Sequence, residues 1–506
     1  MIILVDFGSQ TAHLISRRIR ELGVEVYIAT PEVALEKIKE LKPKGIILSG
    51  GPASVYEKNS PTVEKEIFNL GIPILGICYG QQLMCHLLGG EVKPGYRKEY
   101  GPAVLNLESG IQNSELLKDL PKSFNVWMSH GDNVVKLPKG FENFATTKTI
   151  PYAVIENRQD KIYGIQFHPE VVHSEFGAQV LENFLMICGF TPKKSEINED
   201  FVENIIEDIK DSIGEARVIC ALSGGVDSSV AALLAHKAIG KNLTSVYVDS
   251  GLMREGETEN LKKIFKDRYK MNVDIIDASR EMLKALKGIT DPEEKRKAIG
   301  KTFIEVFDKE AKKINAKFLV QGTIYPDVIE SKGSKHAQNI KSHHNVGGLP
   351  ENMKLVLVEP LRNFYKDQVR KIGDILGLPE SITQRQPFPG PGLAVRIIGE
   401  VTEEKLEILR KADAIVTEEL KNEKLWQTFA VFTGIKTTGV RGDNRAYGET
   451  IAIRAIEATD AMSANFAKLP YEVLEKISVR IVTEVPEVNR VVYDITNKPP
   501  ATMEWE

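Results

Sequence analysis

Short apolar runs alternate with amphipathic stretches over residues 1–190. The apolar runs are Ile2–Val5, Val24–Ile28, Gly45–Leu48 and Ile72–Ile77. They are rich in β-branched residues and bounded by Gly, Pro or Asp, which is typical of buried strands. Two of the stretches between them, Thr11–Leu22 and Pro61–Leu70, have helical periodicity. This alternation predicts a mostly parallel, doubly wound sheet.

A polar stretch without periodicity, Thr191–Asp200, separates this part from a second alternating part and predicts a linker. The second part is expected to contain strand Arg217–Leu222, helix Ser229–Ile239, strand Ser245–Val248 and strand Lys317–Gln321. The loop-rich segment Gln384–Gly392 marks a further boundary, followed by a helix at Glu403–Asn422 and a strand at Arg490–Tyr493.

The predicted fold class is therefore α/β with two doubly wound, mostly parallel sheets and a smaller α+β domain at the C-terminal end. The expected domains are residues 1–190, 191–383 and 384–506. No internal repeat is evident in the sequence.

Composition narrows the class of protein. The chain has 506 residues, of which 42% are hydrophobic and 27% charged, with a formal net charge of −4. No apolar run approaches the roughly 20 residues that span a bilayer, and the first residues (MIILVD) predict a strand rather than a signal peptide. The acidic balance disfavours nucleic acid as a partner. The four cysteines form no CxxC pair, so we expect no zinc site or disulfide framework and a cytoplasmic location.

The first candidate for chemistry is Cys78, in the segment GICYG. An apolar strand runs into this segment and a helix, Gln81–Leu88, leaves it, as in a nucleophile elbow with cysteine in place of serine. The start of a helix favours the reactive thiolate. The alternative is a buried cysteine at the end of a strand, and Cys85, inside the following helix, is assigned to the core.

A nucleophilic cysteine needs a base, and the base needs an orienting group. His168 and Glu170 follow the predicted strand Tyr163–Phe167 and share one face of the extended backbone, so the carboxylate can fix the imidazole tautomer. His130 and His173 are competing bases, but neither has both a strand end and a nearby carboxylate in sequence.

An oxyanion hole is the third part of such a site. The amide of Tyr79, directly after the nucleophile, is one expected donor. Gly50 and Gly51, which follow strand Gly45–Leu48, offer further amides, although the same stretch is compatible with a simple tight turn.

A second motif lies between a strand and an apolar helix and predicts a phosphate loop. It consists of Ser223, Gly224, Gly225, Val226, Asp227, Ser228 and Ser229. Glycines let backbone amides face an anion, and the helix dipole favours negative charge, while Asp227 is a candidate Mg²⁺ ligand. The loop differs from the Walker type, and Gly300-Lys301-Thr302 is expected to be helical instead. Asp249, which ends the next strand, is a weaker candidate for a ribose contact.

Two polar clusters follow. Asp327 and Glu330 are candidates for Mg²⁺ or for the acceptor, whereas Lys332, Lys341, His343 and His344 are candidates for phosphate contacts. A charged surface loop is the alternative for both clusters.

The chain resembles the glutamine-hydrolysing GMP synthases along nearly its whole length. The segments that carry the resemblance are DFGSQ (6–10), LSGGP (48–52), GICYGQQ (76–82), GIQFHPEV (164–171), ALSGGVDSSV (221–230), KSHHNVGGLP (341–350), PFPGPGLAVRI (387–397) and KPPATMEWE (498–506). The first four are shared by many class I glutamine amidotransferases, and the last is the most specific. The family usually has Tyr-Thr-Gln after DFGSQ, whereas this chain has Thr11-Ala12-His13.

The resemblance implies that glutamine, ATP and xanthosine 5′-monophosphate (XMP) are the substrates and that GMP, AMP, pyrophosphate and glutamate are the products. It implies Cys78, His168 and Glu170 as the amidase triad and the Ser223–Ser229 loop as the grip on the pyrophosphate of ATP, with Mg²⁺ near Asp227. It also implies a homodimer through the last domain. Contacts to XMP implied by the resemblance are Arg296, Lys498 and Glu504, with Arg396 as a further candidate.

Elementary chemistry agrees with this reaction. The C2 oxygen of a purine is a poor leaving group, and transfer of AMP onto it makes a good one, so a pyrophosphate-binding loop favours adenylation over γ-phosphoryl transfer. The alternatives are another adenylating amidotransferase such as an NAD synthetase, an RNA-modifying thiolase, and a non-catalytic nucleotide sensor. The C-terminal run argues against the first. The thiolases generally need cysteines in the ATP domain, where this chain has only Cys220.

Overall fold

The computed structural model describes residues 1–9, 11–107, 114–171, 173–193, 197–332, 355–441, 444–458 and 464–506. The chain divides into two compact units, Met1–Glu196 and Ile197–Glu506. Within the described part of the chain, no helix is long and apolar enough to cross a membrane.

The N-terminal unit is built on one nine-stranded sheet with the order β2-β1-β3-β4-β9-β8-β7-β5-β6. Its strands are β1 (Ile2–Val5), β2 (Val26–Ala29), β3 (Gly45–Leu48), β4 (Ile74–Ile77), β5 (Glu91–Leu107), β6 (Ser123–Lys136), β7 (Glu142–Thr146), β8 (Val154–Asn157) and β9 (Ile162–Ile165). Pairing is parallel from β2 to β9 and antiparallel from β9 to β6. Strands β1, β3, β4 and β9 are buried along their whole length, which explains their uninterrupted apolar sequences.

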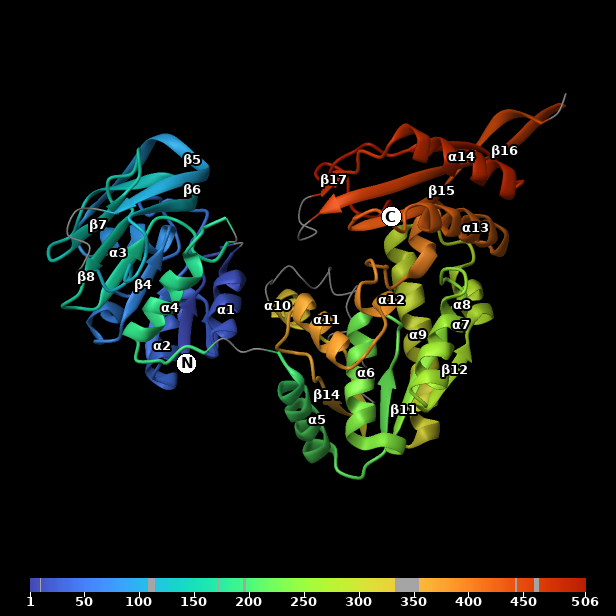
Figure 1. The fold of residues 1–506 in the computed structure, drawn as a ribbon, viewed down its shortest axis with the longest axis horizontal. Helices are drawn as coiled ribbons and strands as arrows, with labels where there is room; N and C mark the ends of the chain where they lie inside the picture. Colours follow the sequence, from blue (N-terminus) through green and yellow to red (C-terminus); the bar gives the residue numbers. More distant parts are fainter. Residues whose placement is uncertain are drawn as a thin grey trace. The chain divides into compact units, whose positions relative to one another are not determined.

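Helices surround the parallel half of this sheet (Figure 1). They are α1 (Ala12–Glu21), α2 (Ala34–Leu41), α3 (Tyr79–Leu87) and α4 (Gly177–Ile187), with short 3₁₀ turns η1 (Pro31–Val33) and η2 (Lys65–Asn69). The α-helix predicted at Pro61–Leu70 is wrong, because only η2 forms there. The Tyr79 hydroxyl donates to the Pro61 carbonyl at 2.5 Å, and Val63 is buried, so tertiary contacts hold the start of the segment extended.

The C-terminal unit contains a five-stranded, wholly parallel sheet with the order β12-β11-β10-β13-β14. Its strands are β10 (Val218–Ala221), β11 (Leu243–Asp249), β12 (Val273–Asp277), β13 (Phe318–Val320) and β14 (Val356–Val358). The accompanying helices are α5 (Glu199–Ile213), α6 (Val226–Ile239), α7 (Glu257–Leu261), α8 (Ser279–Leu286), α9 (Pro292–Ile314), α10 (Tyr325–Lys332), α11 (Lys366–Ile375) and α12 (Glu380–Thr383), with the short helices η4 (Gly240–Asn242) and η5 (Lys262–Arg268). As predicted, Gly300-Lys301-Thr302 is helical, inside α9.

A smaller sheet follows in the same unit, with β15 (Gln427–Arg441), β16 (Asn444–Ala458) and β17 (Ala464–Phe466) antiparallel, and β18 (Val488–Tyr493) parallel to β16. The turn η7 (Gly392–Arg396) and helices α13 (Glu403–Glu419) and α14 (Tyr471–Glu484) accompany it. Helix α9 joins the two sheets, because Ile299 packs in the core beneath the small sheet and Phe307 packs against the parallel sheet. The predicted fold class is confirmed.

Candidate active sites

The first candidate site forms at the carboxyl ends of three neighbouring parallel strands, β3, β4 and β9. Gly50 follows β3, Cys78 follows β4 and His168 follows β9. Because parallel neighbours end at the same edge of a sheet, residues far apart in sequence meet there. A Cβ atom added to Gly50 would lie 3.3 Å from His168 Cε1 and 3.8 Å from Cys78 Cβ, so Gly50 adjoins both side chains.

Cys78 occupies a sharp turn between β4 and α3. Its backbone has φ 52° and ψ −107°, a conformation that non-glycine residues adopt only where the surroundings enforce it. The Cys78 amide donates to the Ile165 carbonyl on β9 at 2.8 Å. On the other side, a Cβ atom on Gly80 would come within 2.3 Å of the Leu48 carbonyl oxygen, so this position requires glycine for α3 to approach β3. These contacts hold the turn.

His168 is fixed from both sides. Its Nδ1 lies 2.7 Å from Oε1 of Glu170, and its amide donates to the Trp127 carbonyl at 3.0 Å. The Ser174 hydroxyl donates to the His168 carbonyl at 2.6 Å. The predicted pairing of His168 with Glu170 is thus a contact in the structure, and Glu170 is only 1% exposed.

The charge state of His168 reflects its neighbours. Burial lowers the pKa of the imidazole, but hydrogen bonds and charge from Cys78 and Glu170 outweigh burial and raise the pKa to about 10. His168 is therefore an imidazolium near neutral pH, paired with a carboxylate on Nδ1 and adjacent to the Cys78 sulfur. Such a pair stabilises a thiolate.

The residues of the predicted oxyanion hole lie next to one another around the Cys78 turn. Tyr79 is the first residue of α3, and its amide has no acceptor within the helix. Gly51 packs against Tyr79, since a Cβ atom there would lie 3.3 Å from the tyrosine ring. The Gly50 backbone lies directly beside Cys78 and His168, so Gly50 and Tyr79 both adjoin the candidate nucleophile.

The competing histidines have other surroundings. His130 is buried, with Nε2 3.5 Å from Oε2 of Glu99, and burial lowers the pKa of its imidazole. The ring of His173 packs on Trp127 with centroids 4.6 Å apart. Cys85 is fully buried in α3, and burial raises the pKa of its thiol, so it has the core position that the sequence predicts.

The second candidate site forms at the carboxyl end of β10, the central strand of the parallel sheet. The loop turns through Gly224 at φ +77° and enters α6 at Val226. Ser228 Oγ ties the loop together: it accepts from the Ser223 amide at 3.1 Å and lies 2.9 Å from Ser223 Oγ. The strand–loop–helix geometry predicted for Ser223–Ser229 is present, with the N-terminus of α6 directed at the loop.

Asp227, in the first turn of α6, lies in a mixed electrostatic setting. Lys366 Nζ lies 2.5 Å from Asp227 Oδ2, whereas Asp227 Oδ1 is buried and has no hydrogen-bond partner among the described residues. Burial raises the pKa of this carboxyl, and the charge of Asp327 adds to the rise, while Lys366 opposes it. Asp327 therefore lies close enough to Asp227 for their charges to interact, which brings two predicted site residues together.

Asp249 ends β11, and both oxygens of its carboxylate already accept hydrogen bonds within the protein. Oδ1 accepts from the Gly251 amide at 2.9 Å, and Oδ2 accepts from the Thr258 hydroxyl at 2.7 Å. A ribose contact at Asp249 would have to share these oxygens.

The residues implied as XMP contacts separate into two groups. Arg396 is fully buried and forms a two-pronged pair with Glu504, with both N–O distances 3.0 Å, and it stacks over Phe429 at 4.0 Å. Gln427 also donates to Glu504, at 2.7 Å. Arg396 and Glu504 thus bind each other, and the guanidinium of Arg396 has no exposed surface to offer a ligand.

Arg296 and Lys498 lie nearer the surface. Arg296 Nη2 donates to the Glu506 carbonyl at 2.5 Å, and the backbone of Lys498 pairs with Ala464. The predicted contacts Lys341, His343 and His344 lie outside the described residues, as do the side chains of Glu330 and Lys332.

Two residues at the phosphate loop had no signal in the sequence analysis. Lys366 meets Asp227, and Arg385 Nη1 donates to the Gly224 carbonyl at 2.8 Å. Arg385 lies in QRQPFPGPG, just before the part of this boundary segment that carries the family resemblance, and Lys366 begins a helix with no distinctive motif. Only the folded chain brings them to the loop.

Comparison with known families covers most of the chain. The family model "Glutamine amidotransferase class-I" matches residues 3–188, "NAD synthase" matches residues 197–302 and "GMP synthase C terminal domain" matches residues 414–505. Together with the two sites, these matches define a glutamine amidotransferase joined to an ATP-using synthetase. The match to NAD synthase covers the same part of the chain for which an NAD synthetase was the alternative interpretation.

Full-length relatives decide the family. "GMP synthase [glutamine-hydrolyzing]" of Clostridium botulinum (strain Kyoto / Type A2) is 54% identical, covering 100% of this chain and 99% of the relative. Proteins of the same name from Caldicellulosiruptor saccharolyticus and Carboxydothermus hydrogenoformans are each 55% identical with the same coverage. The chain belongs to the glutamine-hydrolysing GMP synthase family. It is a ligase that makes GMP from XMP with glutamine as nitrogen donor and ATP as energy source.

The charge on Glu170 is expected to control the protonation of His168. Glu170→Gln removes a negative charge 2.7 Å from Nδ1 and so lowers the pKa of His168 by about 1–3. Titration of ¹⁵N-histidine-labelled protein by NMR measures this pKa. Glu175→Gln is the matched control, because that exposed carboxylate binds Asn125 instead. Equal His168 titrations in wild type and Glu170→Gln would contradict the account.

Proposed function

We propose that Cys78 is the nucleophile that hydrolyses glutamine, with His168 as acid and base and Glu170 as the residue that orients and charges His168. The observation that carries this assignment is the turn that holds Cys78 at a positive φ beside a His168–Glu170 pair. The thiolate attacks the glutamine carboxamide, and the His168 imidazolium gives its proton to the departing ammonia. His168 then takes a proton from the water that releases glutamate.

The amides of Gly50, Gly51 and Tyr79 are proposed as the donors that stabilise the oxyanion of each tetrahedral intermediate. Support comes from the position of Gly50 beside both Cys78 and His168, and from the α3 amide of Tyr79, which no helical carbonyl accepts. Fixed donors aimed at a developing negative charge contribute about 2.7–4 kcal/mol each in such sites.

In the C-terminal unit we propose that the loop Ser223–Ser229 binds the β- and γ-phosphates of ATP. The C2 oxygen of XMP attacks the α-phosphorus, pyrophosphate departs, and ammonia from the Cys78 site then displaces AMP from C2 to give GMP. Loop amides at the start of a helix suit a departing polyanion such as pyrophosphate. We also propose that Asp249 contacts the ribose of ATP. Its carboxylate oxygens would then accept from the ribose in addition to the Gly251 amide and the Thr258 hydroxyl.

Mg²⁺ is proposed at Asp227, with Asp327 nearby. The buried Oδ1 of Asp227, which has no partner in the described part of the chain, fits a metal ligand. Mg²⁺ bound to ATP commonly takes one or two protein carboxylates and completes its shell with phosphates and water. When bound, the ion neutralises charge on the departing pyrophosphate. Lys366 holds the other oxygen of Asp227 and so orients the carboxylate.

For the acceptor we propose Arg296 and Lys498 as contacts to XMP. Further candidates for contacts to the nucleotides are Glu330, Lys332, Lys341, His343 and His344. We also propose Glu504 as a contact to XMP, with Arg396 as a weaker candidate that holds the Glu504 carboxylate in place. We propose domain boundaries near residues 190 and 384, with the last domain completing the acceptor site.

A cytoplasmic location is also proposed, since all four cysteines are free thiols.

A homodimer through the C-terminal sheet is proposed on the basis of an exposed apolar hollow. Ile435, Val492 and Trp505 are 58%, 41% and 39% exposed, and they line a hollow of about 520 Å³ on one face of this sheet. Exposed apolar clusters of this kind mark association surfaces.

Replacing the proposed nucleophile should separate the two halves of the reaction. Cys78→Ala removes the attacking sulfur, so GMP formation with glutamine falls to background, while GMP formation with ammonium salts stays within about twofold of wild type. Following AMP release with each nitrogen donor measures both. Cys85→Ala is the control and keeps glutamine-dependent activity. Loss of both activities in Cys78→Ala would contradict the separation of the sites.

Asp227→Asn should impair the synthetase half alone. It removes the charge that would hold Mg²⁺ on the phosphates, so AMP release falls roughly 100-fold or more with glutamine and with ammonia alike. The exposed Asp374 on α11 supplies the control, Asp374→Asn, which keeps full activity. Near-normal ammonia-dependent turnover by Asp227→Asn would remove this residue from the ATP site.

The dimer proposal predicts that Ile435→Asp dissociates the protein into monomers, because a charge in an apolar contact is desolvated without a partner. Sedimentation equilibrium measures the mass. Val479→Asp, at an equally exposed apolar position on α14, should leave the dimer intact. A monomeric wild type, or an unchanged dimer in Ile435→Asp, would refute this surface.

A further inference from the structure

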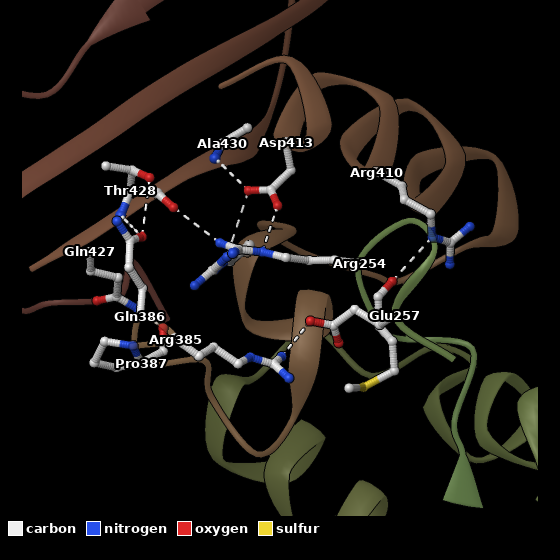
Figure 2. A network of polar contacts seen from close by, with 12 residues as sticks. Arg254, Glu257, Arg385, Gln386, Pro387, Arg410, Asp413, Gln427, Thr428 and Ala430 are labelled. Atoms are coloured by element: carbon white, nitrogen blue, oxygen red, sulfur yellow. Dashed lines mark hydrogen bonds and ion pairs between the residues drawn. The ribbon is translucent and has the colours of Figure 1, made fainter. Parts of the chain in front are cut away.

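Arg385 connects the phosphate loop to a carboxylate on a different element. One arm of its guanidinium, Nη1, donates to the Gly224 carbonyl at 2.8 Å, and the other arm, Nη2, pairs with Oε1 of Glu257 at the start of α7. Figure 2 shows the Arg385 side chain extended toward Glu257. The two side chains are 19% and 17% exposed, so the pair lies mostly inside the protein.

The surrounding contacts restrict where this guanidinium can go. Arg385 lies over the ring of Phe388, with 5.6 Å from its central carbon to the ring centroid. Arg254 lies over the same ring at 5.2 Å and is held by Asp413 at 2.8 Å and by the Thr428 carbonyl at 3.0 Å. Asp413 in turn accepts from the Ala430 amide of β15 (Figure 2). Arg254 is thus anchored to the C-terminal sheet, and Arg385, which shares the Phe388 ring with it, is the arginine that reaches the loop.

The contact with Gly224 fixes the orientation of a peptide group. In a trans peptide, the carbonyl of one residue and the N–H of the next point in opposite directions. Holding the Gly224 carbonyl against Arg385 therefore turns the Gly225 N–H toward the other side, where Ser223 Oγ lies at 3.4 Å. That distance is long for a hydrogen bond, so the Gly225 amide is available for a better acceptor such as a phosphate oxygen.

Gly224 itself gives this peptide freedom to move. Its φ of +77° is accessible to glycine at no cost, and glycine also tolerates the alternative orientations of the peptide that follows it. Among the described contacts, no group of the loop donates a hydrogen bond to the Gly224 carbonyl in place of Arg385. The direction of the Gly225 amide thus depends on a side chain 161 residues away in sequence.

We propose that Arg385 is a positioning residue for ATP, which acts by orienting the Gly224–Gly225 peptide so that the Gly225 amide faces the phosphates. Glu257 holds the guanidinium in the orientation that this contact needs. The proposal rests on the assignment of the Ser223–Ser229 loop to the phosphates of ATP. It gives Arg385 no direct contact with the nucleotide.

The test uses the full chain with ammonia as nitrogen donor, so that the Cys78 site does not limit the rate. Arg385→Lys keeps the positive charge but cannot bond Gly224 and Glu257 in a fixed fork. We expect the KM for ATP to rise about tenfold, as for a lost hydrogen bond to a charged donor, while the KM for XMP changes less than about twofold. The Kd for inorganic pyrophosphate, measured by calorimetry, should rise by the same factor.

Glu257→Gln is the second variant and keeps the shape of the side chain. It should raise the KM for ATP about threefold on its own and add little in the Arg385→Lys background, because both residues act through one contact. Arg268→Lys is the matched control: Arg268 Nη2 also donates to a glycine carbonyl of the same unit, that of Gly377, at 3.1 Å. It should leave the KM for ATP unchanged.

Different results would overturn different claims. An ATP KM and pyrophosphate Kd in Arg385→Lys equal to those of Arg268→Lys would overturn the positioning role, even though Asp227→Asn had lost ATP use. A rise confined to the KM for XMP would also overturn it. If wild type binds no pyrophosphate and Asp227→Asn retains turnover, the phosphate-loop assignment itself fails. Should Arg385→Lys not fold, judged by its melting temperature, Glu257→Gln decides the same question.

Discussion

In each of two sheets, neighbouring parallel strands end at the same edge and so bring together the groups on which both candidate sites depend. In the first sheet, adjacency of β3, β4 and β9 places Gly50, Cys78 and His168 side by side. In the second, adjacency of β10 and β13 places the phosphate loop next to the segment that holds Asp327. A different strand order would separate these residues while leaving every local motif intact.

Within this frame, close backbone approaches set the finer geometry. Gly80 lets α3 press against β3, and the resulting turn holds Cys78 at a positive φ. In the C-terminal unit, a Cβ atom on Gly322 would come within 2.7 Å of the Asp227–Ser228 peptide, so the end of β13 supports the start of α6. The Cys78 turn has a backbone conformation that only tertiary packing can maintain.

Much of this arrangement could be predicted from local sequence, for physical reasons. Strands such as Ile2–Val5 are buried on both faces and therefore read as unbroken apolar runs. His168 and Glu170 pair because alternate residues of an extended chain share one face. The helix predicted at Pro61–Leu70 does not form, because tertiary contacts to Pro61 and Val63 override the helical periodicity of this segment.

Ion pairs between residues far apart in the chain could not be predicted from the sequence. The partnership of Lys366 with Asp227 spans 139 residues, and no spacing rule predicts it. Arg396 and Glu504, both candidates for the acceptor nucleotide, form a pair with each other that no motif predicts, since a motif does not say which charges meet in the fold. The contact of Arg385 with Gly224 spans 161 residues, and nothing in the sequence around Arg385 indicates it.

The proposed role of the loop Ser223–Ser229 is in the transfer of AMP, rather than of phosphate, to the C2 oxygen of XMP. It is tested most directly with XMP carrying ¹⁸O at C2, by mass spectrometry of the products. The account predicts that the label appears in the phosphate of AMP, in amounts equal to the GMP formed. Label in inorganic phosphate or in water, with none in AMP, would contradict it.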